Sequence, residues 1–310
     1  MKLATSTGDF SYYVENITKK IENFEGGKFK YINLEQTGNV PELMNDGDTW
    51  KCLAEDWGNA AKKAGVTFKV SHGPCLDDPV PFDSEEYKIK IRALRRSIEI
   101  CNMLDIERIV IHSCYDKAFS KEELYGYNKR FYSDLLETAE KYNIMILTEN
   151  LPDNAFRFST GREIRDFLDY MNHPLLCACW DTAHGNIDSV ARKIGQYENI
   201  VILGDKLKGL HIADNFGDCH HHTWPFAGNI NFDSVMQGLL DVKYDGYFTF
   251  EASYTLLHRS NPPYGRSGWK HNGISVENLI SPSIELKKKA IDLLYDVGKY
   301  ILETYDCFDE

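Results

Sequence analysis

The chain has 310 residues, of which 43% are hydrophobic and 26% are charged. This composition is ordinary for a globular protein, and it excludes collagen-like and intrinsically disordered chains. No uninterrupted apolar run approaches the roughly 18 residues of a membrane-spanning helix, and the opening residues MKLATST lack the apolar core of a signal peptide. We therefore expect a cytoplasmic protein that has no membrane partner.

Acidic residues outnumber basic residues by 47 to 35, which gives a formal net charge of −12. A negative field of this size repels phosphate backbones, so the composition disfavours nucleic acid as a partner. The eight cysteines include no CxxC pair. We expect reduced and mostly buried thiols, and we expect Cys177 and Cys179 to pack on one face of a strand rather than to bind zinc.

Strand-length apolar runs alternate with amphipathic stretches of helix length along the whole chain. The predicted strands span residues 2–6, 30–35, 67–72, 108–112, 144–149, 176–181, 207–213 and 246–251. The predicted helices span 49–65, 85–105, 120–142, a segment that opens at Thr160, 189–197, 232–240 and 283–305. Eight such units favour one α/β domain over residues 1–310, folded as a closed (β/α)8 TIM barrel. An open doubly wound sheet is the alternative, but no G-x-G-x-x-G motif follows an early strand.

Two connections are unusually long for a compact domain, residues 211–232 and residues 253–281 after the eighth strand. The second connection is aromatic, and its Pro262–Pro263 pair and glycines argue against a helix. We expect it to cover the barrel mouth and to contact another subunit of a homo-oligomer.

Ionisable side chains recur where the predicted strands end. They are His72, His112, Glu149, Asp181 with His184 three residues later, His211 within the seventh strand, and Glu251, and a histidine run at 220–222 follows strand seven. A single buried histidine or carboxylate is more often structural than functional, but here the pattern repeats on six consecutive strands. The carboxyl ends of barrel strands meet at one rim, so these side chains are predicted to lie together. Burying so many ionisable groups without a cation would be costly, which favours a divalent metal site. Asp214, Asp218 and His221 are expected to serve turns and loop structure.

Five segments together resemble a known family. They are LTENLP (147–152), WDTAH (180–184), LHIADN (210–215), HHHTWPFAGNI (220–230) and FTFE (248–251). In this order the segments resemble the xylose isomerase-like TIM barrels, a superfamily of sugar phosphate isomerases and epimerases that also contains endonuclease IV-like proteins (AP endonuclease family 2).

The resemblance implies a metal held by Glu149, Asp181, His211 and Glu251, with the active site at the C-terminal ends of the strands. It implies that His184 meets the substrate. In the endonuclease members, residues matching His72, His112 and His184, with a later pair at His220 and His222, hold further metals. His220 stands where aspartate is usual, and Asp218 is a match two residues out of register. The oxygen-rich quartet suits Mn²⁺ first, with Mg²⁺ or Co²⁺ next, whereas added histidines would favour Zn²⁺.

The first functional hypothesis is a metal-dependent isomerase or epimerase that acts on a sugar or keto-sugar derivative. Glu149 and Glu251 would remove and return the proton next to the carbonyl, through an enediolate that the cation stabilises. A leaving group β to the carbonyl would turn the same chemistry into a lyase reaction. No cluster of arginine and lysine suggests a phosphate site, so an unphosphorylated carbohydrate is preferred.

Two alternatives follow from the same resemblance. One is the larger subunit of a C-glycoside deglycosidase, a lyase-type protein that acts on oxidised glycosides together with a small partner subunit. The other is a zinc-dependent endonuclease at abasic sites in DNA. The full set of His72, His112 and His184 favours the endonuclease, whereas the net charge of −12 argues against it.

Overall fold

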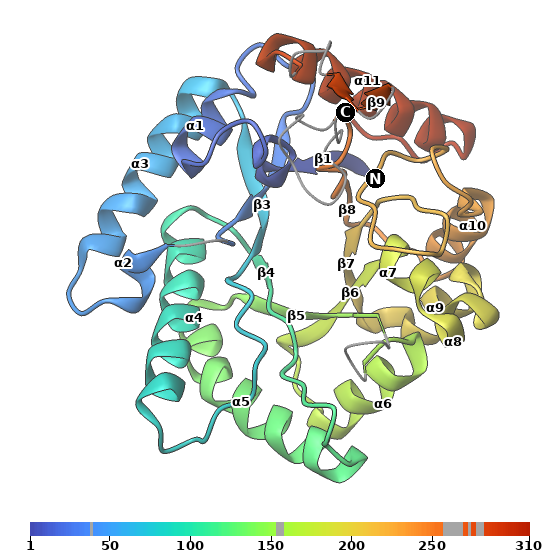
Figure 1. Cartoon of the computed structure of the whole chain (residues 1–310). Helices are drawn as coiled ribbons and strands as arrows, with labels where there is room; N and C mark the ends of the chain where they lie inside the picture. The colour runs from blue at the N-terminus through green and yellow to red at the C-terminus, as the bar shows by residue number, and fades with distance from the viewer. Residues whose placement is uncertain (38–39, 153–157, 257–268, 272–273, 277–281) are drawn as a thin grey trace.

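The computed structural model describes residues 1–37, 40–152, 158–256, 269–271, 274–276 and 282–310. Its main feature is a barrel of eight parallel strands surrounded by helices (Figure 1). The strand order is β7-β6-β5-β4-β3-β2-β1-β8. The strands are β1 (Lys2–Ser6), β2 (Tyr31–Glu35), β3 (Thr67–His72), β4 (Arg108–Val110), β5 (Met145–Glu149), β6 (Leu176–Asp181), β7 (Leu207–His211) and β8 (Tyr247–Thr249).

The barrel closes between β7 and β8 through residues just beyond both strands. Ile212 pairs with Phe250 in a parallel bridge. The Ile212 N–H donates to the Thr249 carbonyl at 2.8 Å, and the Glu251 N–H donates to the Ile212 carbonyl at 3.1 Å. The closure lies at the C-terminal ends of the strands, so it joins the two edges directly at the rim. The predicted (β/α)8 barrel is therefore confirmed.

The helices that cover the barrel follow the strands in chain order. Those predicted from the sequence are α3 (Thr49–Ala64), α4 (Glu85–Met103), α5 (Lys121–Tyr142), α6 (Gly161–Met171), α8 (Ser189–Ile194), α10 (Phe232–Asp241) and α11 (Ile284–Thr304). The capping boxes at Ser120 and Thr160 are both present. Short helices that the sequence did not predict are α1 (Ile17–Glu22), α2 (Pro41–Met44), α7 (Thr182–Ile187) and α9 (Gln196–Leu203).

The predicted helix 189–197 is wrong at its end. Gly195 adopts φ of +98°, a conformation that side-chain-bearing residues rarely take, and it separates α8 from α9. The chain therefore folds into two short helices here, and Asp188 caps the first by accepting hydrogen bonds from the N–H groups of Val190 and Ala191.

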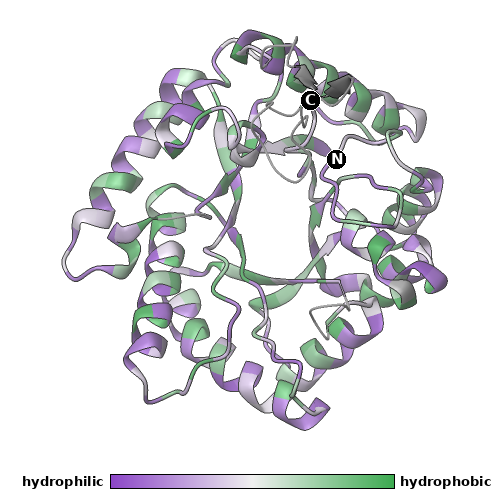
Figure 2. Cartoon of the chain, in the orientation of Figure 1, coloured by the Kyte–Doolittle hydropathy of each residue, from purple (hydrophilic) through white to green (hydrophobic). Residues whose placement is uncertain are grey.

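The core has two parts, because the outer faces of the strands pack against the helices while the inner faces fill the barrel. Hydrophilic residues recur along the surrounding helices (Figure 2). The inner cluster is made of Val70, Val110, Leu147, Cys177 and Cys179. It fills the barrel next to the strand-end ionisable groups and confirms the packing role predicted for the two cysteines.

The expectation that most thiols are buried is wrong for half of them. Cys101, Cys114, Cys177 and Cys179 are buried, Cys219 and Cys307 are partly exposed, and Cys52 and Cys75 are exposed. Cys75 lies three residues beyond the end of β3, where its side chain is exposed to solvent.

Most of the 253–281 connection lies outside the described residues. Its described parts include an antiparallel strand pair, β9 (Trp269–His271) and β10 (Ile274–Val276). Among the helices in the described part of the chain, none combines the length and apolar character needed to cross a bilayer.

Candidate metal centre

Four side chains converge where strands β5 to β8 end. Glu149, Asp181 and His211 are the last residues of β5, β6 and β7, and Glu251 lies two residues beyond β8. One ligand atom from each of the four lies within 4.8 Å of the others. The structure thus brings together the four residues that the family resemblance implied as metal ligands.

Some atoms of this quartet that could bind a metal have no hydrogen-bond partner among the described residues. His211 Nδ1 lies 3.1 Å from Glu149 Oε1 and 3.2 Å from Glu251 Oε2. Within the described residues, Glu149 Oε2, Asp181 Oδ2 and His211 Nε2 are buried and have no hydrogen-bond partner. Buried polar atoms are nearly always paired in native proteins, so unpaired oxygens around one point fit a cation.

The pKa shifts of the quartet carboxylates also favour a bound cation. Burial raises the pKa of Glu251 well above its usual value, and the nearby carboxylates of Glu149 and Asp181 raise it further. Burial also raises the pKa of Glu149, but the charge of His211 and hydrogen bonds from other histidines outweigh this and hold it well below its usual value. Three carboxylates crowded around one imidazole leave a surplus of negative charge, which a divalent cation would neutralise.

A second group of side chains, His184, His220 and His222, lies beside the quartet. His184 Nδ1 donates to the Asn150 carbonyl at 2.8 Å, and its Nε2 lies 3.2 Å from His220 Nε2. The rings of His220 and His222 are 4.0 Å apart, and His222 Nδ1 donates to the Glu251 carbonyl at 3.0 Å. The loop after β7 therefore delivers its histidines to the same rim as the strands.

The structure distinguishes the two possible matches of this loop to the family pattern, one through His220 and the other through Asp218. Asp218 is exposed and lies near His221 and Cys219, whereas His220 and His222 face His184. The Asp214 carboxylate accepts hydrogen bonds from the backbone N–H groups of Asn215, Gly228 and Ile230. Asp214 thus has the turn-forming role that the sequence suggested.

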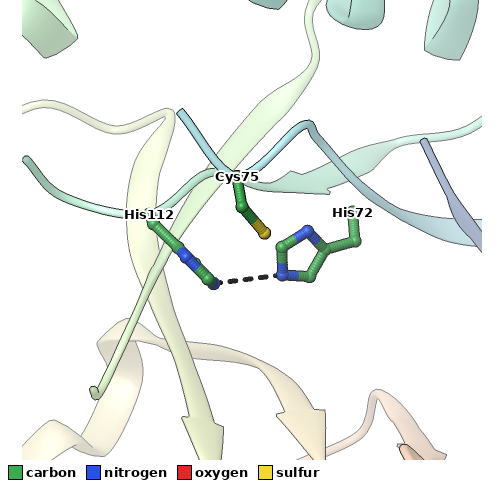
Figure 3. Close-up of side chains that lie close together, drawn as sticks. All are labelled: His72, Cys75 and His112. Carbon is green, nitrogen blue, oxygen red and sulfur yellow. Dashed lines mark hydrogen bonds between the residues drawn. The ribbon is translucent and has the colours of Figure 1, made fainter. Parts of the chain in front are cut away.

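His72 and His112 approach the quartet from the opposite side. Their Nε2 atoms are 3.1 Å apart, and they lie 3.6 Å and 3.4 Å from Glu149 Oε2. Cys75 lies beside them (Figure 3) and was not among the site residues predicted from the sequence. Of the remaining histidines, His258 lies outside the described residues, as does the side chain of His271.

Two polar residues on β2 also face the barrel interior and were missed. Ile32 and Leu34 belong to the outer core, so the alternation of a strand turns Asn33 and Glu35 inward. Within the described residues, the buried Asn33 amide has no hydrogen-bond partner. Glu35 accepts a hydrogen bond from Ser6. The signal was available in the sequence as polar residues at alternate positions of a strand.

A buried lysine supports the segment that follows Glu251. Lys287 of α11 is fully buried, and its Nζ donates to the carbonyls of Ser253, at 3.1 Å, and Thr255. The buried Asp9 carboxylate supplies the opposing charge. The two hydrogen bonds from Lys287 tie the segment after β8 to the last helix, close to Glu251.

Comparison with known proteins places this geometry in context. A family model described as the xylose isomerase-like TIM barrel matches residues 27–269. An uncharacterized protein of Methanocaldococcus jannaschii is 29% identical over 190 residues, which cover 59% of this chain and 63% of that protein, so the match spans less than two thirds of that relative. The L-ribulose 3-epimerase of a Methylomonas species is 32% identical over 94 residues, or 30% of each chain.

Solved structures share the fold over almost the whole chain. A D-tagatose 3-epimerase-like protein superposes with a TM-score of 0.70 and 21% identity, covering 98% of this chain and 100% of that chain. At this level of identity the match establishes a common fold and leaves the activity to be argued from the site.

Proposed function

The chain belongs to the xylose isomerase-like TIM barrel family, and we propose that it is a divalent-metal-dependent isomerase or epimerase of a sugar or keto-sugar. The observation that carries this proposal is the convergence of Glu149, Asp181, His211 and Glu251, with unpaired buried oxygens, at the C-terminal rim of the barrel. Active sites of TIM-barrel enzymes lie at this rim.

The named relatives support the class of substrate. One is an L-ribulose 3-epimerase and another is a D-tagatose 3-epimerase-like protein. Both names refer to ketoses inverted at a carbon next to the carbonyl. We therefore take an unphosphorylated keto-sugar as the substrate and epimerisation beside its carbonyl as the reaction.

The quartet would hold the cation, with Mn²⁺ expected first because three of the four ligands are carboxylates, and with Mg²⁺, Co²⁺ or Zn²⁺ as alternatives. When bound, a divalent cation supplies a Lewis acid next to the carbonyl and hydroxyl oxygens of the sugar and stabilises negative charge that develops there.

Proton transfer falls to two carboxylates of this site. The Glu251 side chain is 17% exposed, whereas the Glu149 side chain is 1% exposed. Of these two, the charged carboxylate would remove the proton from the carbon next to the carbonyl, leaving an enediolate, and the carboxyl that holds a proton would return it to the opposite face; the roles exchange when the epimer reacts back. The Nε2 of His184, oriented by the bond from Nδ1 to Asn150, would hold a sugar hydroxyl.

The proposal is tested with a panel of ketopentoses and ketohexoses that includes L-ribulose and D-tagatose. We expect an epimer to form after loading with Mn²⁺, and none to form after chelation. The matched control is Glu251→Gln, which keeps the shape of the side chain and removes the base. Failure of every sugar with all four metals would overturn the proposal.

A second candidate is an endonuclease at abasic sites in DNA. The specific observation in its favour is that His72, His112 and His184 all approach Glu149, so the rim could hold more than one cation. Incubation of the zinc-loaded protein with an abasic duplex decides between the two, because only the endonuclease would produce a nick.

A further inference from the structure

We propose that a hollow over α4 and α5, on the outside of the barrel, binds a nucleoside phosphate, with the phosphates on Arg95 and Arg130 and the base on Phe82. None of the residues that line this hollow belongs to the candidate metal centre. The inference is therefore independent of the reaction proposed above.

The hollow has the size and the charge of a site for an anionic ligand. Helices α4 and α5 pack side by side around the barrel (Figure 1). The hollow over them has a volume of about 510 Å³, which lies within the range of ligand sites in proteins. Of the charged side chains that line it, five are basic and two are acidic, although the chain as a whole has a net charge of −12. The basic ones are Lys88, Arg92, Arg95, Arg96 and Arg130.

Asp134 of α5 anchors two of these arginines. Its backbone carbonyl accepts hydrogen bonds from Arg95 Nε and Nη2, at 2.9 Å and 2.7 Å, and its carboxylate accepts from Arg130 Nε at 3.0 Å. Arg95 also pairs with the exposed carboxylate of Glu137 at 3.1 Å. The Arg130 side chain uses Nε for its contact and is 63% exposed, so its two Nη groups remain available to a ligand. A guanidinium held in this way suits the paired oxygens of a phosphate.

Positive charge is in excess at this hollow. The Nη atoms of Arg96 donate to main-chain carbonyls of residues 42–47, so Arg96 is not itself a ligand, and it has no carboxylate partner among the described residues. Burial lowers the pKa of Arg96, and the charge of Arg92 lowers it further. A bound anion would relieve this repulsion between neighbouring guanidinium groups.

The same hollow carries an aromatic ring that solvent reaches. Phe82 lines it and is 41% exposed. The ring stacks on Tyr127 at 4.7 Å between centroids and packs at right angles to Tyr87 at 5.0 Å, so two neighbours hold it in place. Nucleobases stack on such rings. Arginines beside an exposed aromatic ring therefore suit a nucleotide better than they suit inorganic phosphate.

The sequence showed no basic cluster of this kind, because Arg130 joins the arginines of α4 only in the fold. Phe82 belongs to the connection between β3 and α4, and Tyr127 belongs to α5. The two parts of the proposed site thus come from three segments that the barrel brings together.

The test is isothermal titration calorimetry of the full-length protein with ADP, pyrophosphate and adenosine as probes. We expect one ADP per chain, bound more tightly than pyrophosphate or adenosine. Arg130→Gln should weaken ADP binding roughly tenfold, which is the lower end of the effect of a lost hydrogen bond to a charged group. Phe82→Ala should weaken it about fivefold or more, the contribution of one stacked base, and should leave pyrophosphate binding unchanged.

The matched control variant is Arg162→Gln, which should bind ADP as the wild type does. The Arg162 side chain is 62% exposed and pairs with Asp166 four residues later, as Arg130 pairs with Asp134, but it lies on α6. Equal ADP affinity in the wild type and Arg130→Gln, absence of ADP binding, or pyrophosphate bound as tightly as ADP would overturn the proposal. Tighter binding of polyglutamate than of ADP would also overturn it, because the hollow would then fit an acidic protein surface.

A second measurement avoids variants and covers the case in which Arg130→Gln does not fold. Phenylglyoxal modification of arginines in the native protein is mapped by mass spectrometry with and without ADP. At a free ADP concentration about ten times Kd, modification of Arg130 should slow about tenfold by mass action, while that of Arg162 should not change. An unchanged rate at Arg130 would contradict binding at this hollow.

Discussion

Asn150 is joined to Asp181 by two hydrogen bonds that link the ends of β5 and β6. Its Nδ2 donates to the Asp181 carbonyl at 2.9 Å, and its Oδ1 accepts from the Asp181 N–H at 2.6 Å. The backbone carbonyl of the same residue accepts from His184 Nδ1. Asn150, which follows Glu149 in the chain, therefore holds the backbone of the proposed metal ligand Asp181 and also orients the imidazole of His184.

Asn150→Ala should weaken metal binding although Asn150 is not itself a ligand. Loss of groups that orient metal ligands typically costs 10–100-fold in affinity or activity, and we expect a loss in that range here. The measurement is a Mn²⁺ titration. The control is Asn199→Ala, which removes another buried asparagine whose side chain accepts from the Gly161 N–H, away from the centre. Equal metal affinity in both variants would argue against the role given to Asn150.

Glu251→Gln should lower turnover by about 10²–10⁴-fold, the usual contribution of a general base. Asp181→Asn should lower both turnover and bound metal, because the amide replaces a charged ligand oxygen. Metal analysis and initial rates measure the two effects. Asp188→Asn is the matched control, since Asp188 is also buried and caps α8. Full metal content together with full turnover in Asp181→Asn would refute the quartet.

Asn33→Ala should raise KM for the sugar and leave metal content unchanged. The buried amide faces the barrel interior and has no partner in the described structure, so a sugar hydroxyl is its natural ligand. Loss of such a hydrogen bond is expected to cost about 1 kcal/mol, or roughly fivefold in KM. The idea fails if steady-state kinetics with the best substrate of the panel give an unchanged KM.

The free energy of unfolding should depend on pH through the titration of Asp9. Burial raises the pKa of this carboxyl from 3.8 to about 6, although Lys287 opposes the shift. Between these pH values the folded state holds a proton that the unfolded state has released, so this group makes stability fall as pH rises from about 4 to 6. The loss is on the order of 3 kcal/mol.

Asp9→Asn supplies the reference for that measurement, because it cannot titrate and other carboxylates contribute alike to both proteins. Urea unfolding at pH 4 and pH 7 should show the wild type losing stability relative to the variant on going to pH 7. A difference between the two proteins that does not change with pH would show that the Asp9 pKa is not raised.

The barrel was predictable because its signals are local and repeated. Thr67–His72 and Leu176–Asp181 form strands with the predicted ends, since apolar runs of that length between helices fit buried parallel strands. The capping box at Ser120 likewise marks where α5 begins. The strand-end positions of Glu149 and Asp181 followed directly, because a parallel barrel gathers such ends, whereas His211 was predicted inside a strand over 207–213 and in fact ends β7.

The remaining features depend on contacts that the sequence does not display. Helix α1, Ile17–Glu22, has six residues, too few for a helical period to stand out. Helix α7 begins where the Asp181 carboxylate accepts from the His184 N–H, so a residue identified as a ligand also serves as a cap. Cys75 looked like an ordinary thiol, because its place beside His72 and His112 becomes visible only in the folded barrel.

The most direct test of the central proposal is solvent hydrogen exchange into the ketose that the enzyme converts best. The metal-loaded protein is incubated with that sugar in D₂O, and deuterium is located by NMR. We predict deuterium at the carbon next to the carbonyl, in step with epimer formation, and no incorporation after chelation or in Glu251→Gln. Formation of the epimer without any deuterium at that carbon would contradict proton removal by Glu251.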